Sequence, residues 1–271
     1  MKDDTVDLVL MGERLEVSAW QSALSATPED ARRPAGLGLE TGPGGAVAIS
    51  ATKLPTPFMN RIIGLGLDGP VDREWLADRL VRYAAAGQPY SVSLCEELAG
   101  DLGPWLVERG LTPRTRLAKM ARRTDDLPPL PDGPAIRDVG VEEAGIFADT
   151  ACRGFGLPES LEGMFAPLPA LDAWRNMLTW VEGAPAGTGS IHLGKDAAWI
   201  GNGSVLPDYR RRGLHRHSML HRMHRAADLG VTWILTETNR PGPGETGPSF
   251  RNMQALGFRI VCERPNFLST A

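Results

Sequence analysis

The sequence is poor in cysteine, with three among 271 residues. Cys95, Cys152 and Cys262 lie far apart, and no pair has the C-x-x-C spacing of a zinc or redox site. An odd number of scattered cysteines excludes a disulfide framework and gives no tetrahedral zinc set. We therefore predict no metal site and expect a reducing compartment, the cytoplasm.

Long apolar runs are also missing. No stretch reaches the roughly 18 apolar residues that a membrane-spanning helix needs, and the opening MKDDTVDLVLMGERL carries acids where a signal peptide has bases. An excess of positive charge is missing too, because 33 acids and 29 bases give a net charge of -4. We therefore predict neither nucleic acid nor a membrane as a partner.

What is present is a globular composition, 42% hydrophobic and 23% charged, which predicts a folded chain. Its 271 residues suit one large domain or two ordinary ones. The segment 123–134, RTDDLPPLPDGP, concentrates proline, aspartate and glycine in the manner of an exposed linker. We therefore predict two domains, residues 1–122 and 135–271.

Apolar periodicity predicts a mixed α/β fold with a similar element order on both sides of this linker. Before the linker, the expected strands are 46–49, 62–67, 90–94 and 111–120, and the expected helices are 72–86 and 100–109. After it, the expected strands are 174–181, 187–193, 197–206, 231–238 and 258–262, and the expected helices are 141–152, 214–229 and 249–256.

The two halves end alike, with a long helix, a glycine, a strand, a second helix, another glycine and a last strand. Gly87 corresponds to Gly230, and Gly110 to Gly257, at nearly equal separations. The second separation is slightly longer than the first, and the loop RPGPGETGP after Asn239 accounts for the extra residues. Surface loops tolerate such insertions at little cost in free energy. This pattern predicts a duplication.

The segment 203–229, GSVLPDYRRRGLHRHSMLHRMHRAADL, has the pattern of an anion site. A strand leads through a tight turn into a helix, whose first N–H groups lack internal partners and lie at the positive end of its dipole. Gly213 permits close approach of the backbone. Charge-assisted donors are added by Arg210, Arg211, Arg212 and Arg216.

The stretch from Val205 to His215, VLPDYRRRGLH, resembles the acyl-CoA pyrophosphate loop of the GNAT superfamily of N-acyltransferases. That signature is Arg or Gln, two residues, Gly, one residue, then Gly or Ala. Arg210 and Gly213 match it, and His215 departs from it. The resemblance implies a GNAT-like fold in two tandem copies, with acetyl-CoA as the cofactor. The cofactor-binding residues that it implies are Val205, Arg210, Arg211, Arg212, Gly213, Leu214, His215, Arg216, Asn239 and Asn252.

Two further stretches resemble the same family. Residues 231–239 resemble the strand that splays from its neighbour to admit the pantetheine arm, and residues 249–258, SFRNMQALGF, resemble the terminal helix and its Leu-Gly-Phe turn. The first half is similar only as a degenerate copy. There, carboxylates surround the corresponding helix start and would repel a pyrophosphate, so we predict one cofactor site, in the second half.

The implied activity is an N-acetyltransferase that moves an acetyl (acyl) group from acetyl-CoA to a primary amine by direct attack. The Val205 N–H is expected to polarise the thioester carbonyl. No carboxylate lies within 197–206, so Glu237 is the first candidate for the base that accepts the amine proton, and His192 is the second. The tyrosine acid of the family corresponds to Met253.

Other interpretations of single features stay open. Arginines between 210 and 225 are also typical of a solvated helix face. His217, His221 and His224 share one face of a helix, but no carboxylate joins them to complete a metal site. A DNA-binding helix-turn-helix is disfavoured by the flanking strands.

A second function also stays open. The missing tyrosine and the side chain of His215 are compatible with a non-catalytic, regulatory protein that binds acyl-CoA. No motif specifies the amine acceptor, the length of the acyl chain or the oligomeric state.

Overall fold

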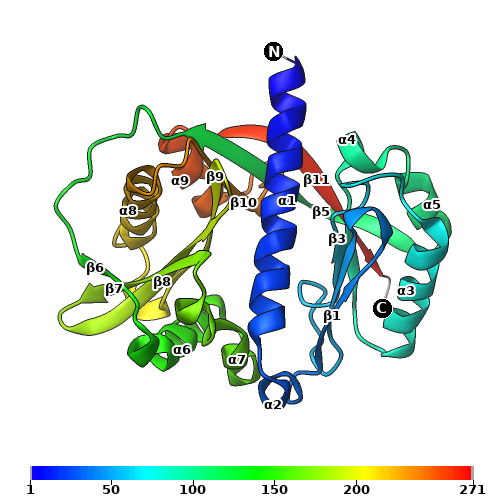
Figure 1. Ribbon diagram of the computed structural model, residues 1–271, viewed down its shortest axis with the longest axis horizontal. Coiled ribbons are helices and arrows are strands. Elements are labelled where there is room, and N and C mark those ends of the chain that lie inside the picture. Colours follow the sequence, from blue (N-terminus) through cyan, green and yellow to red (C-terminus); the bar gives the residue numbers. More distant parts are fainter. Residues whose placement is uncertain (1, 270–271) are drawn as a thin grey trace.

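A computed structural model describes residues 2–269, with side chains from residue 7 onward, as one sheet of eleven strands covered by helices (Figure 1). The strands are β1 (Leu37–Thr41), β2 (Val47–Ala51), β3 (Arg61–Ile63), β4 (Ser91–Ser93), β5 (Leu111–Arg123), β6 (Ala135–Asp138), β7 (Trp174–Val181), β8 (Ala184–Leu193), β9 (Ala197–Val205), β10 (Trp233–Asn239) and β11 (Arg259–Ser269). The helices are α1 (Lys2–Ala26), α2 (Glu29–Arg32), α3 (Arg73–Ala85), α4 (Glu96–Ala99), α5 (Gly103–Glu108), α6 (Ala144–Phe155), α7 (Glu162–Phe165), α8 (Leu214–Asp228) and α9 (Pro248–Ala255).

All the strands and helices expected from periodicity are present, and the mixed α/β class is confirmed. Most bounds differ by a few residues, but the strand expected at 258–262 continues to Ser269. Residues 124–134 contain no helix or strand and form a long excursion between β5 and β6 (Figure 1). Of the described residues, none belongs to a helix both long and apolar enough to cross a membrane.

The two halves of the chain exchange their last strands. The sheet order is β1-β2-β3-β4-β11-β5-β10-β9-β8-β7-β6. Strand β5, from the first half, therefore pairs with β10 of the second half, while β11, from the second half, pairs with β4 of the first. β5 and β11 also pair with each other over most of their length. Each half of the sheet is thus completed by a strand from the other half.

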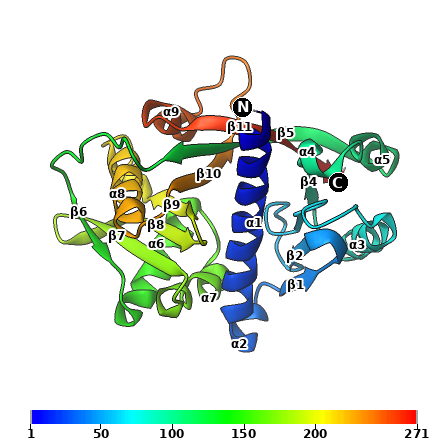
Figure 2. The same ribbon diagram turned by 45° about the horizontal axis from the view of Figure 1, so that its top comes forward.

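Helix α1 was not expected from the sequence, and it runs between the two halves (Figures 1 and 2). Its inward side carries Glu13 and Glu16, which are 1% and 0% exposed. These buried acids interrupt the apolar stripe by which an amphipathic helix is recognised. The helix packs against both halves, since its Leu24 shares a core with Val47 of β2 and with Phe147 of α6.

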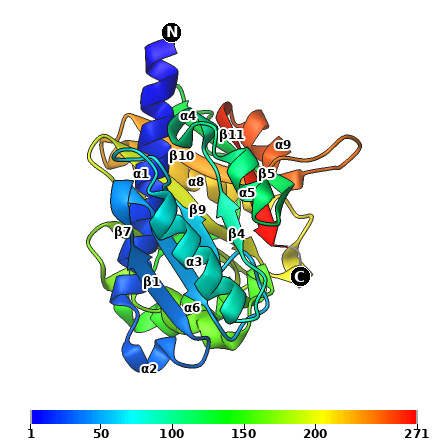
Figure 3. The ribbon, with the colours of Figure 1, turned by 90° about the vertical axis from the view of Figure 1, so that its right-hand side faces the viewer.

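The part of the sheet from the second half is covered on both faces. Along β9, Ala198 and Ile200 belong to a core with helices α8 and α9, whereas Ala197 and Trp199 pack toward α1. This alternation is the period of two expected for a strand. In side view, α1 lies at one face, and the loop before α9 projects from the opposite face (Figure 3).

Candidate active site

Strands β9 and β10 separate soon after they meet. Their parallel pairing covers only the three pairs Trp233↔Ala197, Ile234↔Ala198 and Leu235↔Trp199. Beyond these pairs, the Thr236 hydroxyl donates to the Ile200 carbonyl at 2.9 Å. A cavity of about 460 Å³ opens there, with residues 200–203 on one side and 236–239 on the other. This gap between the two strands, here called the slot, is part of a cavity large enough to hold a ligand.

The loop that leads from β9 into α8 presents unpaired backbone donors. Arg211 and Gly213 adopt left-handed conformations, with φ of 62° and 77°. The first bond of the helix runs from His217 N–H to the Gly213 carbonyl at 3.1 Å. Within residues 2–269, the N–H groups of 211–216 have no hydrogen-bond acceptor. Donors at the positive end of a helix dipole make a site for an anion such as phosphate.

Arg210, an exposed residue, supports this loop through two hydrogen bonds to backbone carbonyls. Its Nε donates to the Val205 carbonyl at 3.1 Å, and its Nη2 donates to the Gly154 carbonyl at 2.9 Å. Arg211, Arg212 and Arg216 are exposed. The predicted arginine of the signature therefore ties the end of β9 to α6, and the other three lie on the surface, with the Arg212 guanidinium over the Tyr209 ring.

His215 lies in the first turn of α8, and its side chain lines the cavity. Burial and, as a smaller contribution, the nearby Arg222 guanidinium lower the pKa of its imidazole to about 4. The ring is therefore neutral at pH 7. Asn252, on α9, lies 3.3 Å from the His215 Nδ1 through its amide nitrogen. These two predicted residues form one contact between α8 and α9.

Aromatic side chains from both halves of the chain line the opposite part of the cavity. Trp20 of α1 and Phe58, before β3, meet edge to face with ring centroids 5.7 Å apart. Phe58 and Phe155 are 50% and 46% exposed, which is unusual for large apolar side chains. Exposed aromatic rings at the edge of a cavity offer a binding surface for an apolar part of a ligand.

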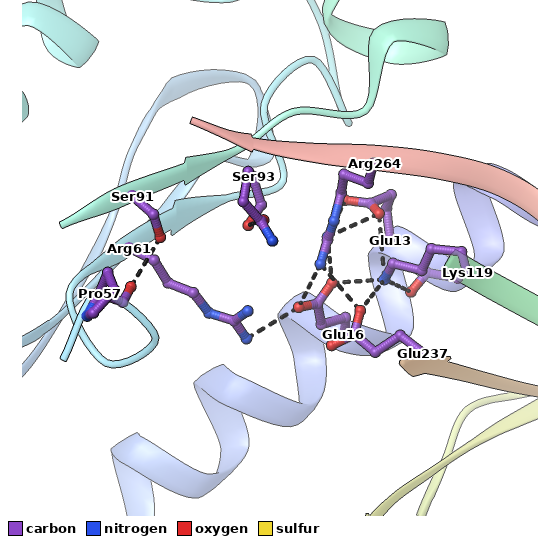
Figure 4. Close-up of polar contacts among 11 residues, drawn as sticks. Glu13, Glu16, Pro57, Arg61, Ser91, Ser93, Lys119, Glu237 and Arg264 are labelled. Atoms are coloured by element: carbon purple, nitrogen blue, oxygen red, sulfur yellow. Dashed lines mark hydrogen bonds and ion pairs between the residues drawn. The ribbon is translucent and has the colours of Figure 1, made fainter. Parts of the chain in front are cut away.

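Six charged side chains form a buried ion cluster beside the cavity (Figure 4). Its members are Glu13, Glu16, Arg61, Lys119, Glu237 and Arg264. Three acids balance three bases, which buried charges require.

Within the ion cluster, Glu16 contacts three bases: Arg264 at 2.5 Å, Lys119 at 2.6 Å and Arg61 at 3.1 Å. Burial alone would raise the pKa of Glu16, but the three cations outweigh it and hold that pKa well below its ordinary value. The carboxylate is therefore ionised, and it joins α1 to β3, β5 and β11.

Glu237 is the member of the ion cluster that reaches the cavity. Its side chain is 13% exposed, and its Oε2 lies 3.0 Å from Arg264 and 3.3 Å from Lys119. Of the cavity-lining residues that the structure describes, Glu237 is the only carboxylate. This first candidate base thus lies where the splayed strands meet the aromatic surface.

Two other predicted residues lie off the cavity. His192 is 2% exposed, shares a 2.9 Å hydrogen bond with the Ser18 hydroxyl and packs against Trp174. Burial lowers the pKa of His192 to about 4. Val205 lies beyond the strand segment that lines the cavity, whereas Asn239 and Met253 line it.

Sequence analysis missed three features of the cavity wall. Gly201–Gly203 form its backbone edge, with Asn202 at φ of 49° beside a register shift between β8 and β9. Trp20 was missed because α1 was not expected. Arg222 was grouped with the other arginines of its helix, although it follows Met219 by three residues on the apolar face, a signal present in the sequence.

No family model matches this chain, and no curated protein matches it in sequence. Solved structures share its fold. A GCN5-related N-acetyltransferase from Kribbella flavida is 20% identical, with a TM-score of 0.62 over 96% of each chain. A GCN5-related N-acetyltransferase from Sphaerobacter thermophilus is 17% identical, with a TM-score of 0.60 over 98% of this chain and 93% of that one.

A tandem GNAT protein from the clavulanic acid biosynthesis pathway is also 17% identical, with a TM-score of 0.56 over 98% of this chain and 95% of that one. The chain therefore has the fold of GNAT acetyltransferases along nearly its whole length, and the predicted GNAT-like fold is confirmed.

Proposed function

We propose that this protein is an acyl-CoA-dependent N-acyltransferase, which moves an acetyl group from acetyl-CoA to a primary amine. One observation carries the proposal: the cavity between β9 and β10 is also lined by His215, which belongs to the segment 211–216 with its unpaired N–H groups. A diphosphate joined to a narrow pantetheine arm matches an anion site next to a slot. The likeness of fold to GNAT acetyltransferases supports the same activity.

We assign the diphosphate to the loop 211–216 and to the exposed Arg211, Arg212 and Arg216 around it. Asn239 and the backbone of Gly201–Gly203 line the slot and supply polar partners for the amides of the arm. The neutral imidazole of His215 adds no charge that would oppose an anion. We also propose that the two halves are tandem copies, of which only the second binds the cofactor.

Bound acetyl-CoA supplies an activated thioester. We assign polarisation of its carbonyl to the backbone of Gly201–Gly203, because Val205 lies off the cavity. The amine nitrogen forms a bond to the carbonyl carbon, the carbon–sulfur bond breaks, and CoA leaves as a thiolate. Glu237 accepts the amine proton, directly or through one water. Met253, buried at the position of the family's tyrosine, offers no proton to the thiolate.

Calorimetry with acetyl-CoA, followed by release of free thiol across a panel of primary amines, tests this function. We expect Gly213→Glu to weaken binding more than tenfold, because it puts a carboxylate among the anion donors. The matched control is Gly183→Glu. Gly183 has a similar φ of 80°, and both glycines have open space around them, so the two variants share the backbone strain.

The outcomes separate the two functions left open by the sequence. Binding together with thiol release on any amine supports the transferase. Tight binding without turnover on every amine favours the acyl-CoA-binding regulatory protein instead. A parent protein that does not bind acetyl-CoA, or a Gly213→Glu variant that binds like the parent, overturns the assignment of the site. Arg210→Ala should also weaken binding, since it releases the end of β9 from α6.

A further inference from the structure

Arg222 is a buried cation without a counter-ion. It lies on α8, is 1% exposed and lines the cavity. Its Nη1 donates to the Gly201 carbonyl at 2.8 Å, and its Nε donates to the Ser218 carbonyl at 3.3 Å. Its Nη2 has no hydrogen-bond partner, and no carboxylate of the described residues forms an ion pair with it. Two donor hydrogens on Nη2 are therefore unused.

Glycines make the space in which this side chain lies. A Cβ atom on Gly189 would lie 2.6 Å from the Arg222 Nε, and one on Gly203 would lie 2.8 Å from its Nη2. Both distances are too short for any larger residue without a shift of the guanidinium. Strands β8 and β9 thus lack side chains where the guanidinium lies, at the edge of the slot.

A guanidinium in this position is costly to the fold. Burial lowers the pKa of Arg222 to about 10, so the group keeps its charge at neutral pH. A buried charge normally has a partner of opposite sign. The Arg61, Lys119 and Arg264 side chains of the ion cluster have such partners, and Arg222 does not. A negatively charged ligand group in the cavity would supply the missing one.

We propose that Arg222 binds a carboxylate of the ligand in this cavity, in addition to the Gly201 carbonyl that it already holds. The planar fork of a guanidinium matches a carboxylate better than any other side chain does. The inference rests on the proposed transferase function and narrows its substrate class. The carboxylate belongs either to the acyl chain, as in the monothioester of a dicarboxylic acid, or to the acceptor amine.

Calorimetry distinguishes these two sources. In the first arm, succinyl-CoA is compared with butyryl-CoA, which has the same chain length and no charge. In the second arm, succinate is titrated onto protein saturated with acetyl-CoA. Tryptophan fluorescence is recorded beside the heat, since Trp20 and Trp199 line the cavity. Arg222→Met has a similar volume without the charge, and Arg222→Lys keeps the charge without the fork. Arg225→Met, as the control, removes a half-buried arginine from the same helix that lies off the cavity and pairs with Asp138.

We expect ligand binding in one of these two arms of the experiment to depend on Arg222. A carboxylate on the acyl chain gives succinyl-CoA tighter binding than butyryl-CoA, and Arg222→Met removes about 10- to 100-fold of that preference, the usual worth of a charged hydrogen bond. A carboxylate on the acceptor instead gives a succinate response in the saturated protein, which Arg222→Met abolishes. Arg222→Lys should retain part of either response, and Arg225→Met all of it.

Failure of this inference is separable from failure of the proposed function. If CoA thioesters bind and neither arm changes in Arg222→Met, the inference is wrong and the function stands. If no CoA thioester binds, the function fails, and succinate titrated onto the free protein decides the inference by itself. Thermal unfolding gives a further readout: Arg222→Met should unfold no lower than the parent, because it removes an unpaired buried charge. A clear loss of stability without any change in ligand preference would show a purely structural role.

Discussion

The Glu237 side chain belongs to the ion cluster and also lines the cavity. Its Oε2 contacts Lys119 and Arg264, while the side chain keeps 13% exposure toward the slot. A carboxylate held by two cations stays in place beside the cavity, within reach of a bound amine. This makes Glu237 the residue whose removal tests the proposed chemistry most directly.

We expect Glu237→Gln to lower kcat about 100-fold, the usual contribution of a general base, and to leave the Kd for acetyl-CoA unchanged. The amide still accepts from Arg264 but does not take a proton from the amine. Steady-state thiol release and calorimetry measure the two quantities. Glu263→Gln, at an exposed residue paired with Arg240, is the control. Full turnover in Glu237→Gln would remove Glu237 from the mechanism.

The sequence located the loop at 210–216, since spacing along one strand–turn–helix unit is a local property. It also made Glu237 the first candidate base, and Glu237 lies on the splayed strand β10 and lines the cavity. It did not separate His192 from the cavity, because whether a strand residue faces α1 or the slot depends on packing far away in the chain. Arg222 was visible as an arginine on an apolar helix face, but its lack of a counter-ion is known only from the fold.

Among the elements, helix α1 contributes two buried acids that join strands of both halves. Glu13 and Glu16 stand on one side of this helix and meet Arg264 and Lys119 from two strands. The helix therefore fixes strands of both halves to one another, beside the Trp20 side chain that lines the cavity. A substitution of a buried acid in α1 should therefore lower the stability of the whole sheet.

We expect Glu16→Gln to lower the free energy of unfolding by about 3–5 kcal/mol, the usual cost of breaking a buried ion pair. The loss leaves Arg61, Lys119 and Arg264 with two acids. Urea denaturation followed by circular dichroism measures it. Asp7→Asn, at an exposed acid of the same helix, should change little. An equal loss in both variants would assign the effect to helix charge rather than to the ion cluster.

Strand β11 shows why element ends were harder to predict than elements. The sequence indicates a strand at 258–262, and the structure continues it to Ser269. Pro265 normally argues against a strand, since it has no N–H. Here its carbonyl still accepts from the Leu94 N–H at 2.9 Å. Tertiary pairing with β4 and β5 extends the strand beyond the reach of local propensity.

At the scale of the molecule, the exchange of strands and the ion cluster act together. β5, β10 and β11 each contribute one charged residue to the ion cluster, namely Lys119, Glu237 and Arg264. Neither half has a complete sheet without the other, and buried ion pairs such as Arg264–Glu16 and Lys119–Glu237 join the two halves. We therefore expect the two halves to unfold as one unit.

Acid should reveal this coupling. The pKa of Glu16 is below its ordinary value of 4.5 in the folded protein, so the unfolded chain takes up the proton first. The free energy of unfolding then falls as pH drops below about 4.5. The buried His192, with a pKa of about 4 in the folded protein against an ordinary value of 6.5, adds a further loss of stability as the pH falls from 6.5 to 4.

Circular dichroism and tryptophan fluorescence should report one coincident transition at each pH. Two separate transitions, or stability that does not change between pH 7 and 3, would contradict this prediction.

The reciprocal placement of β5 and β11 also orders the events of biosynthesis. Residues 259–269 are synthesised long after β4, yet β4 lacks a neighbour on one edge until they are available. The nascent first half must therefore wait with an open strand edge, which is a site for wrong pairing. Strand β11 has to be synthesised before the first half of the sheet reaches its native form.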